Sequence, residues 1–215
     1  MSSYYCILNS NPFFKIIQAT SINILRAFIA IELPTAIQNG LRQVIQQLSP
    51  ETKAVRWLPA ENIHLTIKFL GCVEISRVQA LQTALQQEAD RRHPFEIHVG
   101  TLGTFPNQRR PRVVWMGVQA PQELSALQQG IEEVTLPLGY PSEERPFTAH
   151  LTLGRVSQHA SPDEAAQFGL LLAKKQLGEI GKVRVDTIHL FSSDLRPTGA
   201  VYTSLFQAKL AAGGA

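Results

Sequence analysis

The sequence predicts a mixed fold of helices and strands, arranged as two lobes that a pseudo-twofold axis relates. Apolar runs typical of strands alternate with amphipathic segments typical of helices, which excludes an all-β sandwich. The order strand–helix–strand–helix–strand occurs twice along the 215 residues. The tripeptide His-Leu-Thr lies on the middle strand of each half, at 64–66 and again at 150–152. A chain of this length suggests one domain, or two small lobes that share a core.

The first half begins at Leu25 with a compact apolar run that Pro34 ends, as is typical of a buried strand. The first helix is expected to be capped by Thr35 and the second by Ser76, and both have apolar residues at helical spacing. The expected elements are, in order, a strand at 25–34, a helix at 35–48, a strand at 63–70, a helix at 76–92 and a strand at 94–103, where apolar and polar residues alternate.

The second half repeats this plan. Its second helix opens with Ser161 and Pro162, a favoured pair of cap and first helical residue. The turn-forming sequence RPTG separates the last two strands. The expected elements are a strand at 112–118, a helix at 121–134, a strand at 147–156, a helix at 161–176, and strands at 182–194 and 199–207.

The two His-Leu-Thr tripeptides carry the candidate catalytic residues. Successive side chains of a strand point to opposite faces, so each histidine shares a face with its threonine while the leucine points to the core. His64 is thereby paired with Thr66, and His150 with Thr152. A single copy on a strand is most simply a hydrogen-bonded structural histidine. Two copies at equivalent places in similar halves favour a shared function.

Two imidazoles and two hydroxyls, with no carboxylate in either motif, suit a phosphodiester substrate if the lobes bring them together. One neutral imidazole takes a proton from the attacking water, and one protonated imidazole gives a proton to the leaving oxygen. The hydroxyls stabilise the non-bridging oxygens. The main rival is a metal site, but zinc and iron sites usually have three or more protein ligands, often including a carboxylate. We therefore expect no metal.

The net charge of +3 does not by itself mark a nucleic-acid-binding protein. The positive charge is nevertheless clustered, with Arg109, Arg110 and Arg112 close together and a second group at 91–93. A solvated loop and a contact with the phosphate backbone of a nucleic acid each explain such a cluster, and the sequence leaves both open.

The ends of the chain are expected to lie outside a single bilobal domain at 25–210. Residues 1–24 are a poor signal peptide, and we interpret them as a loosely ordered extension or the product of a start codon placed too far upstream. Residues 211–215 are expected to form a flexible tail. No apolar run reaches membrane-spanning length. Two cysteines, Cys6 and Cys72, are too few for a disulfide framework and favour a reducing compartment. We expect a cytoplasmic monomer.

At these residues the sequence resembles a known family. The sequences HLTI and HLTL resemble the HxTx motifs of the 2H phosphoesterase superfamily. Several flanking segments resemble its RNA 2′,3′-cyclic phosphodiesterase branch, historically called 2′-5′ RNA ligases: RAFIAIELP, VRWLPAENIHLTIKFLG, GTFPNQRRPRVVWMGV, RPFTAHLTLGRV and GAVYTSLF. The resemblance extends from about Leu25 to about Phe206. It does not include the extension before Leu25.

This resemblance implies an α+β fold in which two antiparallel sheets, with helices on their outer faces, flank a central cleft. It also implies hydrolysis of an RNA 2′,3′-cyclic phosphate to a 2′-phosphomonoester without a metal or other cofactor. By the same resemblance, His64 is the proton donor to the leaving 3′-oxygen and His150 is the base for water. Thr66 and Thr152 match phosphate-contacting positions. Arg155 matches a position often held by arginine, although regular alternation puts it on the core face of its strand unless a bulge intervenes.

Two alternatives remain open from the sequence. The same site run in reverse would join a 5′-hydroxyl end to a cyclic phosphate as a 2′-5′ linkage. A more distant alternative is a non-catalytic RNA-binding module that uses the arginines at 109, 110 and 112. That second account gives the duplicated His-x-Thr pairs no role.

Overall fold

The structure, a computed structural model, describes residues 23–175, 177–197 and 199–212. Most of the predicted extension and of the predicted tail therefore lie outside the described residues, and both interpretations stay predictions. Cys72 is disulfide-bonded, a bond that the count of two cysteines did not lead us to expect. Cys6 lies outside the described residues.

The helices and strands follow the predicted order. They are β1 (Ile24–Ile31), α1 (Thr35–Leu48), η1 (Ser49–Glu51), β2 (Val55–Trp57), η2 (Ala60–Asn62), β3 (Leu65–Glu74), α2 (Ile75–Ala89), β4 (Phe95–Phe105), β5 (Val113–Gln119), α3 (Gln122–Thr135), η3 (Leu136–Leu138), β6 (His150–Val156), α4 (Pro162–Lys174), β7 (Gly181–Val185), β8 (Thr187–Arg196) and β9 (Gly199–Lys209). Strand β2 was not predicted. The single strand predicted at 182–194 is two strands, β7 and β8, which separate at Asp186.

The strands form one sheet in the order β7-β4-β5-β6-β3-β1-β8-β9, with β2 paired to β6, and the pairings are antiparallel. This order is symmetric about the junction of β3 and β6. The two sheets that the resemblance implies are thus joined into one. The halves of the sequence are interleaved, because β4 of the first half pairs with β5 of the second half, while β8 of the second half pairs with β1 of the first. The α+β fold with two pseudosymmetric lobes is confirmed.

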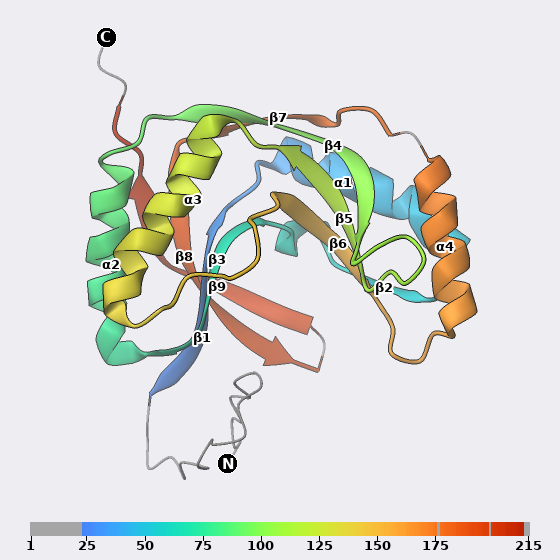
Figure 1. The fold of residues 1–215 in the computed structure, drawn as a ribbon, viewed down its shortest axis with the longest axis horizontal. Coiled ribbons are helices and arrows are strands. Elements are labelled where there is room, and N and C mark those ends of the chain that lie inside the picture. Colours follow the sequence, from blue (N-terminus) through green and yellow to red (C-terminus); the bar gives the residue numbers. More distant parts are fainter. Residues whose placement is uncertain (1–22, 176, 198, 213–215) are drawn as a thin grey trace.

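The helices follow the same symmetry. In Figure 1, α2 and α3 lie together at the left and α4 lies at the right, with the strands between them. Helices α2 and α3 pack on the lobe formed by β3, β1, β8 and β9. In the other lobe, α1 contacts β7 and α4 contacts β4. Within the described residues, no helix has both the length and the apolar character needed to cross a bilayer.

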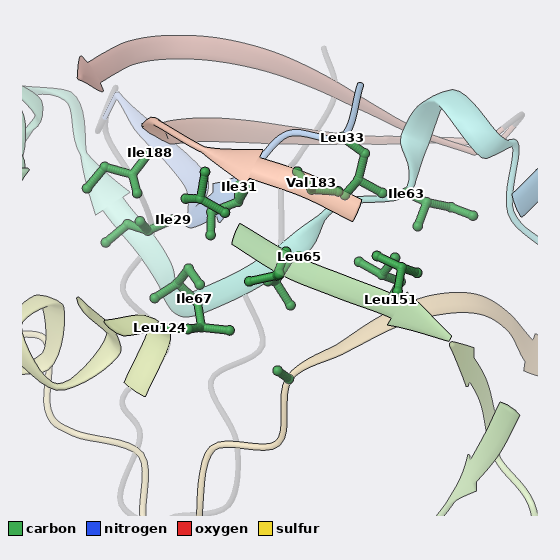
Figure 2. Packing of buried hydrophobic residues seen from close by; sticks show 14 of the residues in the cluster. Ile29, Ile31, Leu33, Ile63, Leu65, Ile67, Leu124, Leu151, Val183 and Ile188 are labelled. Atoms are coloured by element: carbon green, nitrogen blue, oxygen red, sulfur yellow. The ribbon is translucent and has the colours of Figure 1, made fainter. Parts of the chain in front are cut away.

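The core joins both lobes through the middle strands. Leu65 of β3 and Leu151 of β6 are fully buried, and both belong to one cluster that also includes helix residues such as Leu124. Figure 2 shows these leucines among the buried side chains. Fully burying one leucine stabilises the fold by about 1.5–3 kcal/mol. The leucines of the two tripeptides therefore contribute to a core that both lobes share.

Only one of the three predicted helix caps is confirmed. Ser161 accepts a hydrogen bond from the backbone N–H of Glu164, and the Glu164 carboxylate accepts one from the backbone N–H of Ser161, which is a complete capping box. Thr35 and Ser76 are instead the first residue of α1 and the second residue of α2. An extended residue of poor capping type precedes each of those helices.

Candidate active site

The two His-x-Thr pairs lie on the same face of the sheet. Leu65 and Leu151 are antiparallel partners, and both point into the core. Because strand side chains alternate, the residues immediately before and after each leucine point to the opposite face. That face therefore carries His64 and Thr66 from one strand and His150 and Thr152 from the other. It is called the motif face below.

The antiparallel register sets how these four residues are paired. Leu65–Leu151 is the one residue pair recorded between β3 and β6. One step to either side of it, a regular antiparallel ladder would set His64 against Thr152 and Thr66 against His150. The two histidines are then diagonal neighbours, which in a regular ladder are roughly 7–8 Å apart. The pseudo-twofold axis passes between them.

Both imidazoles are held by the same hydrogen bond. His64 Nδ1 lies 3.0 Å from the carbonyl oxygen of Asn62, and His150 Nδ1 lies 2.7 Å from the carbonyl oxygen of Thr148. A carbonyl oxygen only accepts, so Nδ1 must carry the hydrogen in each case. Nε2, the nitrogen farther from the backbone, is left for chemistry in both rings. The two imidazoles are therefore held in the same tautomer, with the hydrogen on Nδ1.

The surroundings of His64 are aromatic. Its ring stacks on Phe28, with centroids 4.6 Å apart, and meets Tyr202 edge-on at 5.0 Å. Phe28 is buried, yet it stands on the motif face, apart from the main core cluster. Burial lowers the pKa of His64 to about 4, against a smaller rise from the hydrogen bond to the Asn62 carbonyl. The imidazole is therefore neutral at pH 7 in the free protein.

His150 has a different neighbourhood. Phe105 meets its ring edge-on at 4.9 Å, and Trp115 lies at 6.4 Å. Its ring stacks flat on neither of them, since the interplanar angles are 85° and 60°. The two halves therefore match in backbone position and hydrogen bonding but differ in the rings around the imidazole.

A β-bulge places Arg155 on the motif face. Along β5, the alternate residues 113, 115 and 117 share one face, and they pair with Arg155, Thr152 and His150 respectively. The register shifts between the Val113–Arg155 pair and the Trp115–Thr152 pair. Strand β6 therefore contains one more residue than β5 between these two pairs, which is a β-bulge. Arg155 is exposed and shares the face of the two catalytic candidates. This bulge is the condition under which the sequence pattern of β6 allows Arg155 to lie on that face.

Electrostatics link Arg155 to the His64 side of the site. Burial raises the pKa of the Tyr202 hydroxyl, while the positive charges of Arg155 and Arg26 act to lower it. The guanidinium of Arg155 is thus close enough to Tyr202 for its charge to be felt there. Tyr202 in turn contacts the His64 ring. Residues of both lobes consequently surround the same part of the motif face.

Sequence reasoning missed the aromatic residues around the imidazoles. In a regular strand, Phe28 points to the face opposite to that of Ile29 and Ile31. This alternation could have indicated that Phe28 lies on the same face as the histidines. Tyr202 and Phe105 come from distant strands and carry no local signal of their own. Among the described residues, no group of three or more His, Cys, Asp and Glu side chains could hold a metal ion.

Comparisons with known proteins identify the family of the chain. The family model described as LigT-like phosphoesterase matches residues 31–115 and 117–202. The RNA 2′,3′-cyclic phosphodiesterase of Methanothermobacter thermautotrophicus is 32% identical over 180 residues, which cover 84% of this chain and 96% of that protein. The enzyme of the same name from Archaeoglobus fulgidus is 31% identical over 181 residues, covering 84% and 98%.

Solved structures show the same fold. The crystal structure of E. coli LigT complexed with 3′-AMP is 27% identical and has a TM-score of 0.71, covering 87% of this chain and 98% of that one. A crystal structure from Thermus thermophilus has a TM-score of 0.74 at 24% identity, covering 88% and 100%, and supports the fold alone. The matched family model includes both His-x-Thr strands and nearly all of the sheet, and the chain belongs to the LigT-like phosphoesterase family.

Proposed function

We propose that this protein hydrolyses the 2′,3′-cyclic phosphodiester at the end of an RNA to a 2′-phosphomonoester. The observation that carries the proposal is the antiparallel pairing of Leu65 with Leu151, the middle residues of the two His-x-Thr motifs. Relatives about 30% identical over most of the chain are named RNA 2′,3′-cyclic phosphodiesterases, which supports the choice of substrate.

The reaction needs one proton acceptor and one proton donor on opposite sides of phosphorus. The oxygen of water attacks phosphorus and its proton passes to Nε2 of His150. The bond from phosphorus to the 3′-oxygen breaks, and that oxygen receives the proton of His64 Nε2. Each positioned proton transfer typically contributes about 10²–10⁴-fold to the rate. The assignment of donor and acceptor follows the family resemblance, because the two halves bind their imidazoles alike.

The low pKa of His64 places a condition on its role as donor. At a pKa of about 4 the free imidazole carries no proton on Nε2 at pH 7. A phosphodiester anion against the ring favours the protonated form, and in an apolar setting this attraction is strong. His64 therefore takes up its proton together with the substrate. The reverse assignment, with His64 as the base, needs no such uptake.

Hydroxyls and a cation complete the site. Thr66 and Thr152 are partly buried on the motif face and donate hydrogen bonds to the non-bridging oxygens as negative charge develops. Arg155 adds a positive charge beside them. With two proton-transfer groups and these donors, the proposed reaction requires no metal ion.

The test is product analysis on an oligonucleotide with a defined 2′,3′-cyclic phosphate, in the presence of EDTA. The wild type should yield the 2′-phosphate, and His64→Ala and His150→Ala should each lose at least about 10² in rate. His159→Ala removes an exposed loop histidine and should leave the rate unchanged. Full activity in either motif variant, or wild-type activity that disappears with EDTA, would contradict the mechanism. Supplying a 5′-hydroxyl RNA in the same assay measures ligation against hydrolysis.

A further inference from the structure

A cavity of about 780 Å³ lies where the loop from Pro106 to Arg112 connects β4 to β5. Arg109, Arg110, Asn107 and Trp115 are among its lining residues. Neither catalytic imidazole lines it. The proposed hydrolysis therefore gives this cavity no role.

The cavity and the imidazole of His150 have one aromatic neighbour in common, Trp115. Trp115 lines the cavity, pairs across the strands with Thr152, and lies 6.4 Å from the imidazole of His150. Phe105, at the end of β4, lies 5.1 Å from Trp115 and 4.9 Å from the same imidazole. The cavity therefore lies beside the proposed phosphate site.

The lining suits a polyanion. Arg109 and Arg110 are exposed, and neither forms an ion pair with any carboxylate in the described part of the chain. Their backbone N–H groups both donate to Asn107 Oδ1 at 3.0 Å, which fixes the loop that presents them. Two cations beside an aromatic residue are the combination that binds single-stranded nucleic acid.

Two buried polar atoms in this wall also lack partners. The hydroxyl of Thr104, a residue only 7% exposed, and the indole N–H of Trp115 have no hydrogen bond to any described residue. Such groups are costly to leave unpaired, and native proteins usually satisfy them with protein, water or ligand. Both atoms are closed off from solvent, as are Trp57 Nε1 and His189 Nδ1 elsewhere in the described residues, so they do not by themselves indicate a ligand in the cavity.

We propose that this cavity binds the nucleotides that precede the cyclic phosphate, with Arg109 and Arg110 on their backbone phosphates. This rests on the proposed function and makes it more specific, because the substrate is then an RNA strand rather than a cyclic mononucleotide. The contacts are remote from the reacting atoms, so they strengthen ground-state and transition-state binding equally. Their loss raises KM and leaves kcat nearly unchanged.

The test compares a 2′,3′-cyclic mononucleotide with an oligonucleotide that ends in the same cyclic nucleotide. For Arg109→Ala/Arg110→Ala, kcat/KM on the oligonucleotide should fall about threefold to tenfold, mainly through KM. Hydrolysis of the mononucleotide should not change. The slope of log(kcat/KM) against log salt should become shallower by about 1.4, or about 0.7 for each lost phosphate contact on a single strand.

Two variants serve as controls. Arg109→Lys/Arg110→Lys keeps both charges and should retain the wild-type salt slope. Arg91→Ala/Lys174→Ala removes two exposed charges near the carboxyl ends of α2 and α4, and should leave both substrates unaffected. Equal losses on both substrates in the alanine pair at 109 and 110, or no loss on either, would overturn the proposal.

Failure of the proposed function can be separated from failure of this inference. If the wild type hydrolyses neither substrate, the proposed function fails. Binding of an oligonucleotide with a 2′-phosphate end, measured by fluorescence anisotropy, still decides the inference. Weaker binding and a shallower salt slope in Arg109→Ala/Arg110→Ala would support it, whereas unchanged binding would overturn it.

Discussion

The imidazole of His64 stacks on the phenyl ring of Phe28, with the planes 24° from parallel. Tyr202 covers the edge of the same ring pair, 5.0 Å from the imidazole and 5.2 Å from the phenyl ring. Such packing removes water from His64, and water is what stabilises an imidazolium. The pKa of His64 falls to about 4 for that reason. Folding, binding and catalysis should all depend on pH through this one residue.

Stability should reveal the low pKa directly. In the unfolded chain His64 binds a proton as the pH falls through its ordinary value of 6.5, while in the folded chain it stays neutral down to about 4. The stability from this group is thus present above pH 6.5 and is lost as the pH falls towards 4. Between pH 8 and pH 5 the wild type should lose about 2 kcal/mol of unfolding free energy that His64→Gln keeps.

Denaturant titrations at the two pH values measure this difference. His159→Gln is the matched control, because it removes a histidine from an exposed loop. This control should follow the wild type. If His64→Gln also follows the wild type between pH 8 and pH 5, the imidazole is not shielded as the structure indicates.

Binding of a phosphate ligand should draw a proton onto the site. Since the free His64 is neutral at pH 6–7, an anion that raises its pKa must be accompanied by proton uptake, and affinity should increase as the pH falls. Calorimetry of a nucleoside 2′-phosphate in buffers of different ionisation heat gives the number of protons. The difference between wild type and His64→Gln isolates this residue. Uptake that is the same in both proteins would favour His64 as the base and His150 as the donor.

Arg155 should contribute to phosphate binding but not to folding. Its side chain is exposed on the motif face, so Arg155→Ala should change stability by less than about 0.5 kcal/mol. Loss of charge-assisted contacts should reduce kcat/KM on a cyclic nucleotide by about tenfold to a hundredfold, with partial recovery in Arg155→Lys. Spectroscopic titration should show a higher Tyr202 pKa in Arg155→Ala, since the guanidinium charge acts to lower it. An unmoved tyrosine would place Arg155 away from the His64 side.

The buried ion pair between Lys68 and Glu132 should matter for stability more than any exposed pair. Lys68 is 2% exposed and also donates to the carbonyl oxygen of Tyr140, which ties β3 to α3 and the segment after it. Lys68→Met leaves the Glu132 carboxylate buried without its cation, and should cost about 3–5 kcal/mol.

A double-mutant cycle isolates this pair. Lys68→Met/Glu132→Leu should recover much of the loss, because neither charge is then left buried. Lys175→Met is the control, since it breaks an exposed pair with Glu51, and should cost less than about 1 kcal/mol. Urea denaturation of each variant gives the free energies. A strictly additive double variant would show that the buried pair is not coupled.

The parts of the fold that depend on local periodicity were predictable from the sequence. Alternation along the strands placed His64 with Thr66 and His150 with Thr152, and the duplicated order of elements predicted two lobes. The three-residue strand β2 was too short to give a period, so it was missed. The break at Asp186 was missed because both flanking segments are equally strand-like.

The rest of the candidate site depends on contacts between distant residues. The face on which Arg155 lies is decided by a register shift between β5 and β6, which the sequence of β6 does not reveal. The rings on His64 come from positions 28 and 202, more than 30 and 130 residues away respectively. The pKa of His64 follows from those rings. Its protonation state was therefore beyond the reach of pattern analysis.

The exchange of strands between the lobes bears on why His64 and His150 have different surroundings. Neither half of the sequence encodes a whole lobe, since β4 and β8 each complete the sheet built by the other half. A single copy of the half-length unit would form both lobes only by pairing with a second, identical copy. Its two histidines would then have identical surroundings. Because the two halves are different sequences within one chain, one histidine can be enclosed by Phe28 and Tyr202 while the other is not.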